Sequence, residues 1–426
     1  MVTQRTIALQ DVTTGGDILL METSRSGVSG GLVSLLLAVT QFAFVIFLFT
    51  GHFKGHDALA WFPLDLTLVA ATLLTVLAVL CFCATGGRLR TEAFWMVLFF
   101  SAMAAAALWT EWTPYALEKA SHFYSVTLLA ALAPAILLPN PKAIRRFVFL
   151  VVIFGLVVSS GVLMQLAGGG FSGGIDERTA SFTSTTTALA WDAGQALAAL
   201  YVCMFRGGKW LRVAPICVLL LVAMVASGAR GPLFLAVLLL AVMTLLFGPR
   251  NRFAIIGTIA LLMLSGVAVN EFSSHLPQGS IRRINAVLQG QDDASADARR
   301  TANLAAIDAV IDNPMGMGFG GFARVYNFGG GTDRIFPHNL VMEIASENGI
   351  FVAVLFVGIM ALALTRSYHA ARKSVELQPF FAMLVFATAN TLISGELNAD
   401  RLAYALLTIG LQLRGPSVAP LASGEL

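Results

Sequence analysis

A lone histidine stands before a polar helix start in the stretch FPHNLVMEIASENG, residues 336–349. His338 is followed by Asn339, a residue type that commonly caps a helix N-terminus. A neutral imidazole accepts protons near neutral pH, which makes His338 a candidate general base. Glu343 and Glu347 share one face of the predicted helix, where they could orient the imidazole or face water. A lone histidine is more often an interfacial or capping residue, so both interpretations stay open.

Arg230 is the only charged residue in ASGARGPLF, residues 226–234. The apolar runs on either side leave so short a connection that the guanidinium must lie near the ends of both runs. It could anchor a helix end at a membrane surface. It could also bind a phosphate, because a guanidinium is planar and permanently charged.

Arg299 and Arg300 begin RRTANLAAIDAVIDNP, residues 299–314. Apolar residues repeat there at helical spacing and stop before Pro314, which predicts an amphipathic helix on the membrane or over a cavity. A cation at a helix N-terminus opposes the macrodipole, so helix stability does not explain the pair. An anionic ligand would explain it, as would the nearby acids Asp292, Asp293 and Asp297.

The stretch MGMGFGGFARVYNFGGG, residues 315–331, holds seven glycines in 17 residues. Such a stretch lets the backbone approach a ligand closely, but it is more often a flexible connector. Other chemistries fit the chain poorly. The carboxylates of QDDASAD are adjacent rather than separated as a metal site needs, and neither an ATP-binding loop nor a nucleic-acid-binding feature is found. We expect no metal, no cofactor and no nucleic acid. The cysteines lie in or at the ends of apolar runs without zinc or redox spacing: Cys81, Cys83, Cys203 and Cys217.

Membrane helices must position these residues. Of the 426 residues, 12% are charged, about half the share in a soluble domain, and the mean hydropathy is +0.79. Apolar runs long enough to cross a bilayer as helices recur along the chain. The fold class predicted is all-α, a polytopic integral membrane protein. About twelve transmembrane helices are expected, near residues 31–50, 64–84, 92–110, 121–139, 146–166, 185–205, 210–227, 231–248, 253–270, 340–365, 378–395 and 399–413.

The basic residues predict the orientation of these helices. With a cytoplasmic N-terminus, inner segments hold 16 of the 27 lysines and arginines, and the short outer connections hold five. Positive short loops stay cytoplasmic, so both termini are expected there. The outer five are Lys54, Lys119, Arg178, Arg230 and Arg401. The expected divisions are a cytoplasmic segment 1–30, nine helices over 31–270, one large outer loop 271–338, three helices over 339–414, and a cytoplasmic tail 415–426.

Three patterns together resemble the O-antigen ligase/polymerase superfamily of integral membrane glycosyltransferases. They are SGARGPL, the loop pattern ending in NPMGMGFGGF, and FPHNLVMEIASENG. Each is weak alone, but their order, spacing and common outer location make the resemblance specific, and with the spans it covers most of the chain. The resemblance implies a GT-C-like fold. The usual family spacing favours Arg299 over Arg300 as the loop arginine, although the tryptophan often found four residues later is Asn303 here.

Within this superfamily the length, the spans and the single large loop look most like an O-antigen ligase. Such an enzyme lies in the bacterial inner membrane with a periplasmic active site. It moves a glycan from undecaprenyl diphosphate to a lipid A-core sugar, so these molecules and membrane lipids are the implied partners. The resemblance implies a metal-independent, inverting transfer, with His338 as the base and with Asn339, Glu343 and Glu347 as possible orienting residues. It implies that the diphosphate is bound by arginines, namely Arg230 and Arg299, with Arg300 and Arg178 in reserve.

Two alternatives stay open. A polymerase of the same superfamily often shows an arginine followed by ten residues and a glycine in its outer loops, and the outer arginines here lack that glycine. A transporter of lipid-linked glycans also needs charge within the membrane, and Asp192 in the sixth expected span is the place to look. Paired repeats and helices broken at mid-membrane, which transporters often show, are not evident.

Overall fold

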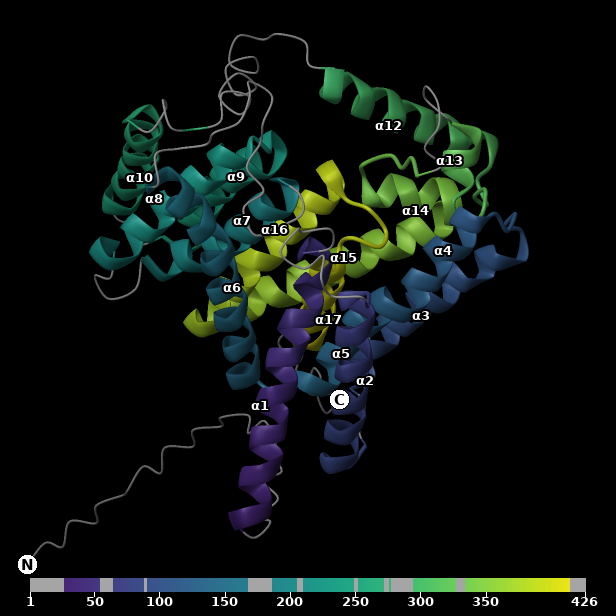
Figure 1. The fold of residues 1–426 in the computed structure, drawn as a ribbon, viewed down its shortest axis with the longest axis horizontal. Coiled ribbons are helices and arrows are strands. Elements are labelled where there is room, and N and C mark those ends of the chain that lie inside the picture. The colour runs from purple at the N-terminus through teal and green to yellow at the C-terminus, as the bar shows by residue number, and fades with distance from the viewer. Residues whose placement is uncertain are drawn as a thin grey trace, which may run out of the picture.

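The computed structural model describes residues 27–53, 64–87, 90–167, 186–204, 210–248, 252–271, 276, 294–326 and 334–413. Every regular element within these ranges is helical, so the all-α prediction is confirmed for the part of the chain that is described. Figure 1 shows the helices gathered in one body, with α12 across the end opposite to the start of α1.

The α-helices are α1 (Gly27–Phe49), α2 (Leu66–Ala84), α3 (Phe94–Ala105), α4 (Pro114–His122), α5 (Leu128–Leu137), α6 (Pro141–Ala167), α7 (Thr186–Met204), α8 (Trp210–Ser227), α9 (Arg230–Phe247), α10 (Arg252–Glu271), α12 (Ala294–Asp312), α13 (Gly321–Val325), α14 (Leu340–Asn348), α15 (Ile350–Lys373), α16 (Gln378–Ser394) and α17 (Arg401–Gln412). Short turns extend or join them: η1 (Thr50–Phe53), η3 (Thr91–Ala93), η4 (Ala106–Leu108), η5 (Phe123–Thr127) and η6 (Val375–Leu377).

Nine helical segments among the described residues are long and apolar enough to cross a membrane, which supports the polytopic class. Helices α7, α10 and α17 coincide with the other three expected spans but are not among the nine, so the number twelve stays a prediction. The nine are Gly31–Phe53, Leu66–Ala84, Thr91–Leu108, Pro114–Leu137, Pro141–Val162, Trp210–Ser227, Arg230–Phe247, Ile350–Lys373 and Val375–Ser394.

Two expected spans have different boundaries in the structure. The fourth begins at Pro114 rather than at 121, because the Thr113 side chain accepts a hydrogen bond from the Ala116 N–H and Pro114 occupies the first helical position. The tenth, expected as one helix over 340–365, is two helices. Gly349 separates α14 from α15 with φ of 98°, a backbone conformation that favours glycine.

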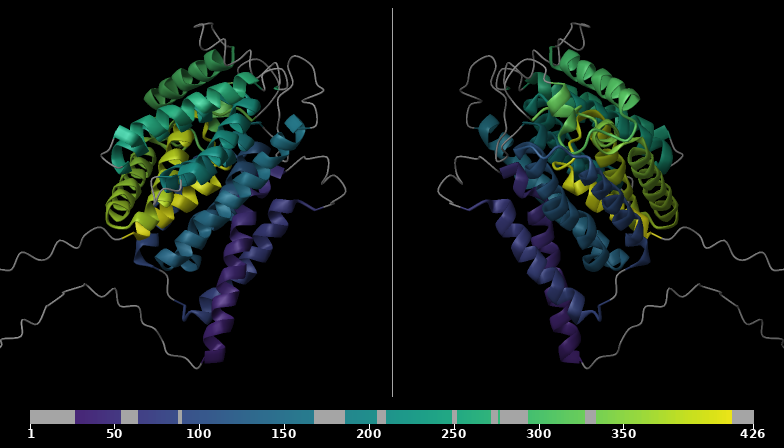
Figure 2. Two further views of the ribbon diagram at one scale, coloured as in Figure 1. Left: turned by 90° about the vertical axis from the view of Figure 1, so that its left-hand side faces the viewer. Right: turned by 90° about the vertical axis from the view of Figure 1, so that its right-hand side faces the viewer.

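Two helices from the expected outer loop, α12 and α13, pack against α14. Helix α12 lies beside α13 and α14 at one end of the molecule, and the side views show the same arrangement (Figures 1 and 2). Its buried face is made of small residues, which permit close helix contact. Of the four larger apolar residues whose spacing predicted the helix, Leu304, Ile307 and Ile311 are exposed. The fourth, Val310, is half-buried against the core. The buried residues are Ala302, Ala305, Ala306 and Ala309.

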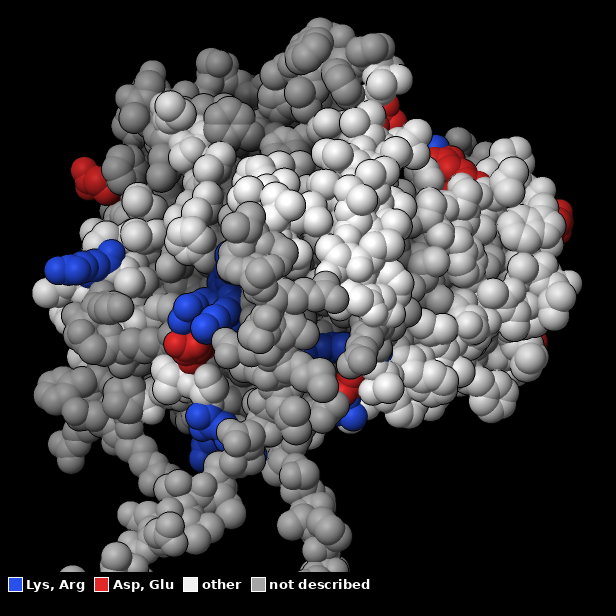
Figure 3. Space-filling view, turned by 90° about the horizontal axis from the view of Figure 1, so that it is seen from below, with Lys and Arg blue, Asp and Glu red and all other residues white. Residues whose placement is uncertain are grey.

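The opposite end of the molecule carries basic side chains. Seen from below, lysines and arginines form separate groups, some of them beside acidic residues, and most other described residues in view are uncharged (Figure 3). Arg145 on α6 pairs with Glu376 in the turn between α15 and α16 at 3.0 Å. Both lie in segments that the charge distribution assigns to the cytoplasmic side.

Candidate active site

His338 has an unusual backbone conformation. Its φ of 59° makes it the one non-glycine residue with positive φ among those described. Such a conformation costs on the order of 1–3 kcal/mol and persists only where neighbouring structure fixes it. The buried Pro337 precedes His338 in the chain. The centroid of the His338 ring lies 4.4 Å from that of the Phe336 ring. The half-buried imidazole is therefore held in one place at the start of α14.

Asn339 fixes the other side of this residue. Its side-chain oxygen accepts hydrogen bonds from the N–H groups of Val341 at 3.0 Å and Met342 at 3.2 Å, so the predicted N-cap is confirmed. Asn339 therefore caps α14 directly after His338, and its orienting role stays a prediction.

Arg299 acts on His338 through its charge. Burial lowers the pKa of His338 below its ordinary value of 6.5, and the positive charge of Arg299 lowers this pKa further. The imidazole is thus neutral at pH 7 and able to accept a proton. Arg299 is half-buried on α12, whereas Arg300 is exposed. Of the two arginines, Arg299 is therefore the one whose charge acts on the histidine.

The arginine pair does not open its helix as expected. Helix α12 begins at Ala294, so Arg299 and Arg300 lie in its second turn. The field of the macrodipole falls off within the first turn, and the dipole argument for an anion at this pair was wrong. The predicted end of the helix before Pro314 is confirmed, because α12 ends at Asp312.

Arg230 lies on a different element. It is half-buried and is the first residue of α9, after a turn in which Gly228 has φ of 68°. A Cβ added to Gly231 would lie 3.2 Å from Ile393, so the start of α9 packs against the end of α16. Arg178, the fourth predicted arginine, lies outside the described residues.

Glu343 and Glu347 neither face water nor contact the imidazole. Both are fully buried, and both bind the ammonium group of Lys119 on α4, at 2.6 and 2.7 Å. Glu343 also accepts a hydrogen bond from the Leu397 N–H at 2.9 Å. The predicted orienting role is corrected: the glutamates hold α14 against α4, because a buried carboxylate needs an opposite charge. Lys119, expected in an outer connection, is only 3% exposed.

The first half of the glycine-rich stretch also holds α14. The N–H groups of Met317 and Gly318 donate to the carbonyls of Ser346 and Glu347, at 2.9 and 2.8 Å, and so satisfy the end of the helix. Gly316, with φ of 85°, has no room for a side chain, because a Cβ would lie 2.5 Å from the Glu347 carbonyl oxygen. The flexible-connector interpretation is wrong for this part of the stretch, and residues 327–331 are outside the described range.

Two other loop arginines pair with acids beside α4. Arg334 binds both oxygens of Glu118, at 2.8 and 2.9 Å, and Arg324 pairs with Glu111. These exposed pairs are worth little stability individually. Both arginines are engaged by these acids.

Residues 215–357 match the family model described as O-antigen ligase. This segment is similar to the O-antigen ligase family. The match supports the superfamily predicted from sequence, and the matched segment includes Arg230, Arg299 and His338. No curated protein matches the chain.

Proposed function

We propose that the protein is an O-antigen ligase that transfers a glycan from undecaprenyl diphosphate to a sugar hydroxyl of the lipid A core. The main support is the neutral, fixed imidazole of His338 beside Arg299, within the segment that matches the O-antigen ligase family model. The membrane helices supply the surface at which two lipid-linked substrates can meet.

In the proposed reaction, His338 accepts the proton of the acceptor hydroxyl as its oxygen attacks the anomeric carbon. The new carbon–oxygen bond forms on one face while the bond to the diphosphate breaks on the other, so the configuration inverts. The diphosphate leaves with the bonding electron pair. Arg299 and Arg230 stabilise its growing negative charge, and this step needs no metal ion. Arg300 and Arg178 remain the alternative residues for binding the diphosphate.

The position of Arg299 links donor binding to base strength. In the free enzyme the arginine disfavours the protonated imidazole. A bound diphosphate beside Arg299 offsets that positive charge and raises the pKa of His338. The histidine therefore becomes a stronger base when the donor is present.

The proposed location is the bacterial inner membrane, with both termini cytoplasmic and the site facing the periplasm. The charge distribution supports it, since inner segments hold 16 of the 27 lysines and arginines and the short outer connections hold five.

The test of this function is replacement of His338 by alanine. We expect the loss of ladder-length O-antigen from lipopolysaccharide on gels, with a rate loss of about 10²–10⁴-fold, because base catalysis is lost. His369→Ala, which changes an exposed histidine on α15, is the matched control and keeps the ladder. A normal ladder from His338→Ala at normal protein level would exclude the histidine as base.

A further inference from the structure

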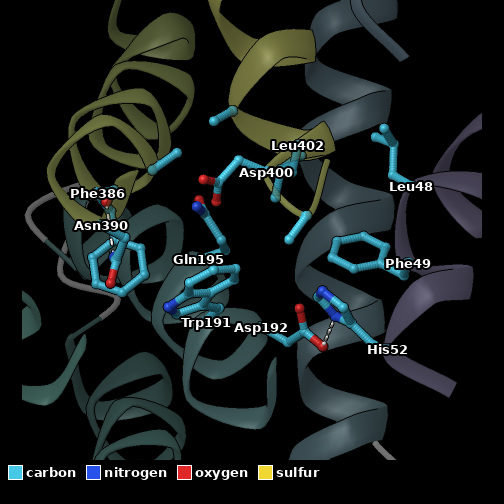
Figure 4. Close-up of a pocket in the computed structure, with 13 residues that line it drawn as sticks. Leu48, Phe49, His52, Trp191, Asp192, Gln195, Phe386, Asn390, Asp400 and Leu402 are labelled. Carbon is cyan, nitrogen blue, oxygen red and sulfur yellow. Dashed lines mark hydrogen bonds and ion pairs between the residues drawn. The ribbon is translucent and has the colours of Figure 1, made fainter. Parts of the chain in front are cut away.

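A small polar cavity lies apart from His338, between the end of α1, the middle of α7 and α16, and the turn before α17 (Figure 4). Its volume is about 30 Å³, which is room for a water molecule or two. The polar groups around it, among them Gln195 and Asn390, therefore need no larger ligand. A surface feature of the described residues calls for more explanation than this cavity does.

Helix α12 exposes an apolar surface on the side opposite to α14. Leu304, Ile307 and Ile311 are 52%, 41% and 69% exposed, whereas the small residues of the helix pack toward α14. With 3.6 residues per turn, these three side chains lie within about 60° of one another around the helix axis. We call these three residues the α12 stripe.

Charged residues border the α12 stripe. Asp297, Asp308 and Asp312 are exposed and lie within about 60° of one another, in the sector next to the stripe. Arg300 is exposed one turn before Leu304, on the side of the stripe. A helix with an apolar sector beside an acidic one is suited to the boundary between lipid and water.

Hydrogen bonds fix the end of α12 at the ends of membrane-spanning segments. The Ile350 N–H donates to the Pro314 carbonyl at 2.9 Å, and Ile350 begins the segment Ile350–Lys373. The Phe319 N–H donates to Thr110 Oγ1 at 3.1 Å. Thr110 lies between two further spanning segments, Thr91–Leu108 and Pro114–Leu137. The residues that directly follow α12 are therefore held where three spanning segments begin or end.

Tryptophans mark the same level of the molecule. Trp109 and Trp112, on either side of Thr110, are 37% and 51% exposed. Tryptophan is concentrated where a membrane meets water, so their position agrees with the ends of the spanning segments.

The exposed apolar surface also continues from α15 to α12. Phe351, in the first turn of the spanning helix α15, is 73% exposed, and Met315 is 59% exposed. A Cβ added to Gly349, just before α15, would lie 2.7 Å from the Met315 carbonyl oxygen, so these residues are close. Met315 follows Ile311 by four residues. The surface that α15 presents to lipid thus leads to the end of the α12 stripe.

We propose that the α12 stripe inserts among the lipids of the membrane leaflet at this end of the bundle, with the acidic sector in water. Transfer of three large apolar side chains from water to lipid is favourable. The stripe shares no residue with the proposed base, so the lipid contact does not depend on the reaction. Its consequence for catalysis rests on the proposed function: Arg299, on the same helix, is held near the lipid headgroups, where the diphosphate of a lipid-linked donor lies.

The test places a nitroxide spin label on single cysteines of the full-length protein, with the four native cysteines changed to alanine. The protein is reconstituted in nanodiscs of phosphatidylethanolamine and phosphatidylglycerol. Oxygen concentrates in lipid and a nickel chelate stays in water, so the relaxation of the label by each reports its surroundings. We expect the labels at Ile307→Cys and Ile311→Cys to be relaxed mainly by oxygen. The label at Asp308→Cys, the adjacent exposed position, is the matched control and should be relaxed mainly by nickel.

Two results would overturn the proposal. Equal access of the nickel chelate to the labels at Ile307→Cys and Asp308→Cys would show that the stripe faces water. Protection of the Ile307→Cys label from both oxygen and nickel would show that a protein surface covers the stripe, either a second copy of the chain or another partner.

The wild-type protein gives a second measurement, which covers the case that the cysteine variants do not fold. Nanodiscs that contain a phospholipid with a photoreactive diazirine in its acyl chain are irradiated, and the protein is digested with trypsin. Cleavage after Arg300, Arg324, Arg334 and Arg366 releases peptides 301–324 and 335–366. We expect lipid adducts on both, since the second contains the membrane-spanning part of α15 and is the positive control. Adducts on 335–366 alone would contradict the proposal. Neither measurement needs turnover, so their failure is distinct from a failure of the proposed ligation, which His338→Ala tests.

Discussion

Arg299 and His338 come from different elements, yet the charge of Arg299 adds to the effect of burial in lowering the pKa of His338. Since α12 carries the arginine and α14 follows the histidine, their relation depends on how the outer loop folds back. The base is thus tuned by an element that need not touch the acceptor.

Arg299→Ala should raise the pKa of His338, because a positive neighbour no longer disfavours the imidazolium. The acidic limb of the pH profile of kcat/KM should move to higher pH, and the rate should fall through loss of diphosphate binding. Arg300→Ala, which changes the adjacent exposed residue, is the control and should leave the limb in place. An unshifted limb in Arg299→Ala would contradict the electrostatic link.

Local signals explain which site residues could be predicted. His338 and Asn339 stand out in sequence because a cap and a proline mark a helix start within a few residues. The partner of Glu343 and Glu347 could not be found in this way. Lys119 is 228 residues from Glu347 in the chain, and only the packing of α4 against α14 brings them together.

At the scale of elements, α14 is a short polar helix held from three sides. Helix α4 supplies Lys119, the turn before α17 supplies the Leu397 N–H, and the glycine-rich stretch caps its end. This support explains how the positive φ of His338 persists, because strained backbone needs neighbours that leave no alternative.

Lys119→Met should destabilise the protein by about 3–5 kcal/mol, because two buried carboxylates lose their counter-charge. Thermal melting in detergent measures the effect. Adding Glu343→Gln and Glu347→Gln to Lys119→Met should recover most of the loss. Glu118→Gln, which breaks an exposed pair in the same helix, should change stability by less than about 1 kcal/mol. A melting temperature for Lys119→Met equal to that of Glu118→Gln would show that the buried ion pairs contribute little to the stability of the protein.

Gly316→Ala should destabilise the protein by at least about 1–2 kcal/mol, since alanine is strained at positive φ and its Cβ would meet the Glu347 carbonyl. Gly358→Ala on α15, where a Cβ meets nothing within 4 Å, should be neutral or slightly stabilising. Thermal melting and ligation assays of both variants give the comparison. Equal behaviour would mean that the glycine-rich stretch is not a fixed cap.

The division between α14 and α15 shows a limit of apolar patterns. Residues 340–365 are apolar enough to suggest one continuous helix. The φ of Gly349 and the hydrogen bond from the Ile350 N–H to the Pro314 carbonyl divide them into α14 and α15. Tertiary contacts of this kind leave no period in the sequence.

For the whole molecule, the fold class followed from composition because burial in lipid selects for long apolar helices throughout a chain. The arrangement of those helices did not follow, since hydropathy does not specify neighbours. The buried charges near α14 depend on that arrangement. Burial, together with the negative charge of Glu343, raises the pKa of Glu396 from 4.5 to about 7.

Glu396→Gln should reduce the pH dependence of stability. Between about pH 4.5 and pH 7 the folded chain keeps this proton while the unfolded chain releases it, so the stability of the wild type falls as pH rises, by up to roughly 3 kcal/mol. The glutamine variant lacks this loss, so its melting temperature should rise relative to that of the wild type as the pH increases from about 5 to 8. Glu376→Gln, at an exposed ion pair, is the control. Parallel curves for Glu396→Gln and wild type would contradict a raised pKa.

The ion pairs between α4 and α14 also bear on biogenesis. During synthesis, Lys119 enters the membrane long before the ribosome reaches its glutamates, 224 to 228 residues later. An ionisable group at that depth is unfavourable until its counter-ion arrives, so the early helices cannot complete their final assembly alone. A nascent chain that stops before α14 would carry a membrane helix with an unmatched ammonium group, a feature that quality-control proteases could recognise. The helix bundle would then be stable only after the chain is complete through α14. Pulse-chase measurement of the turnover of chains truncated before and after residue 349 would test this dependence.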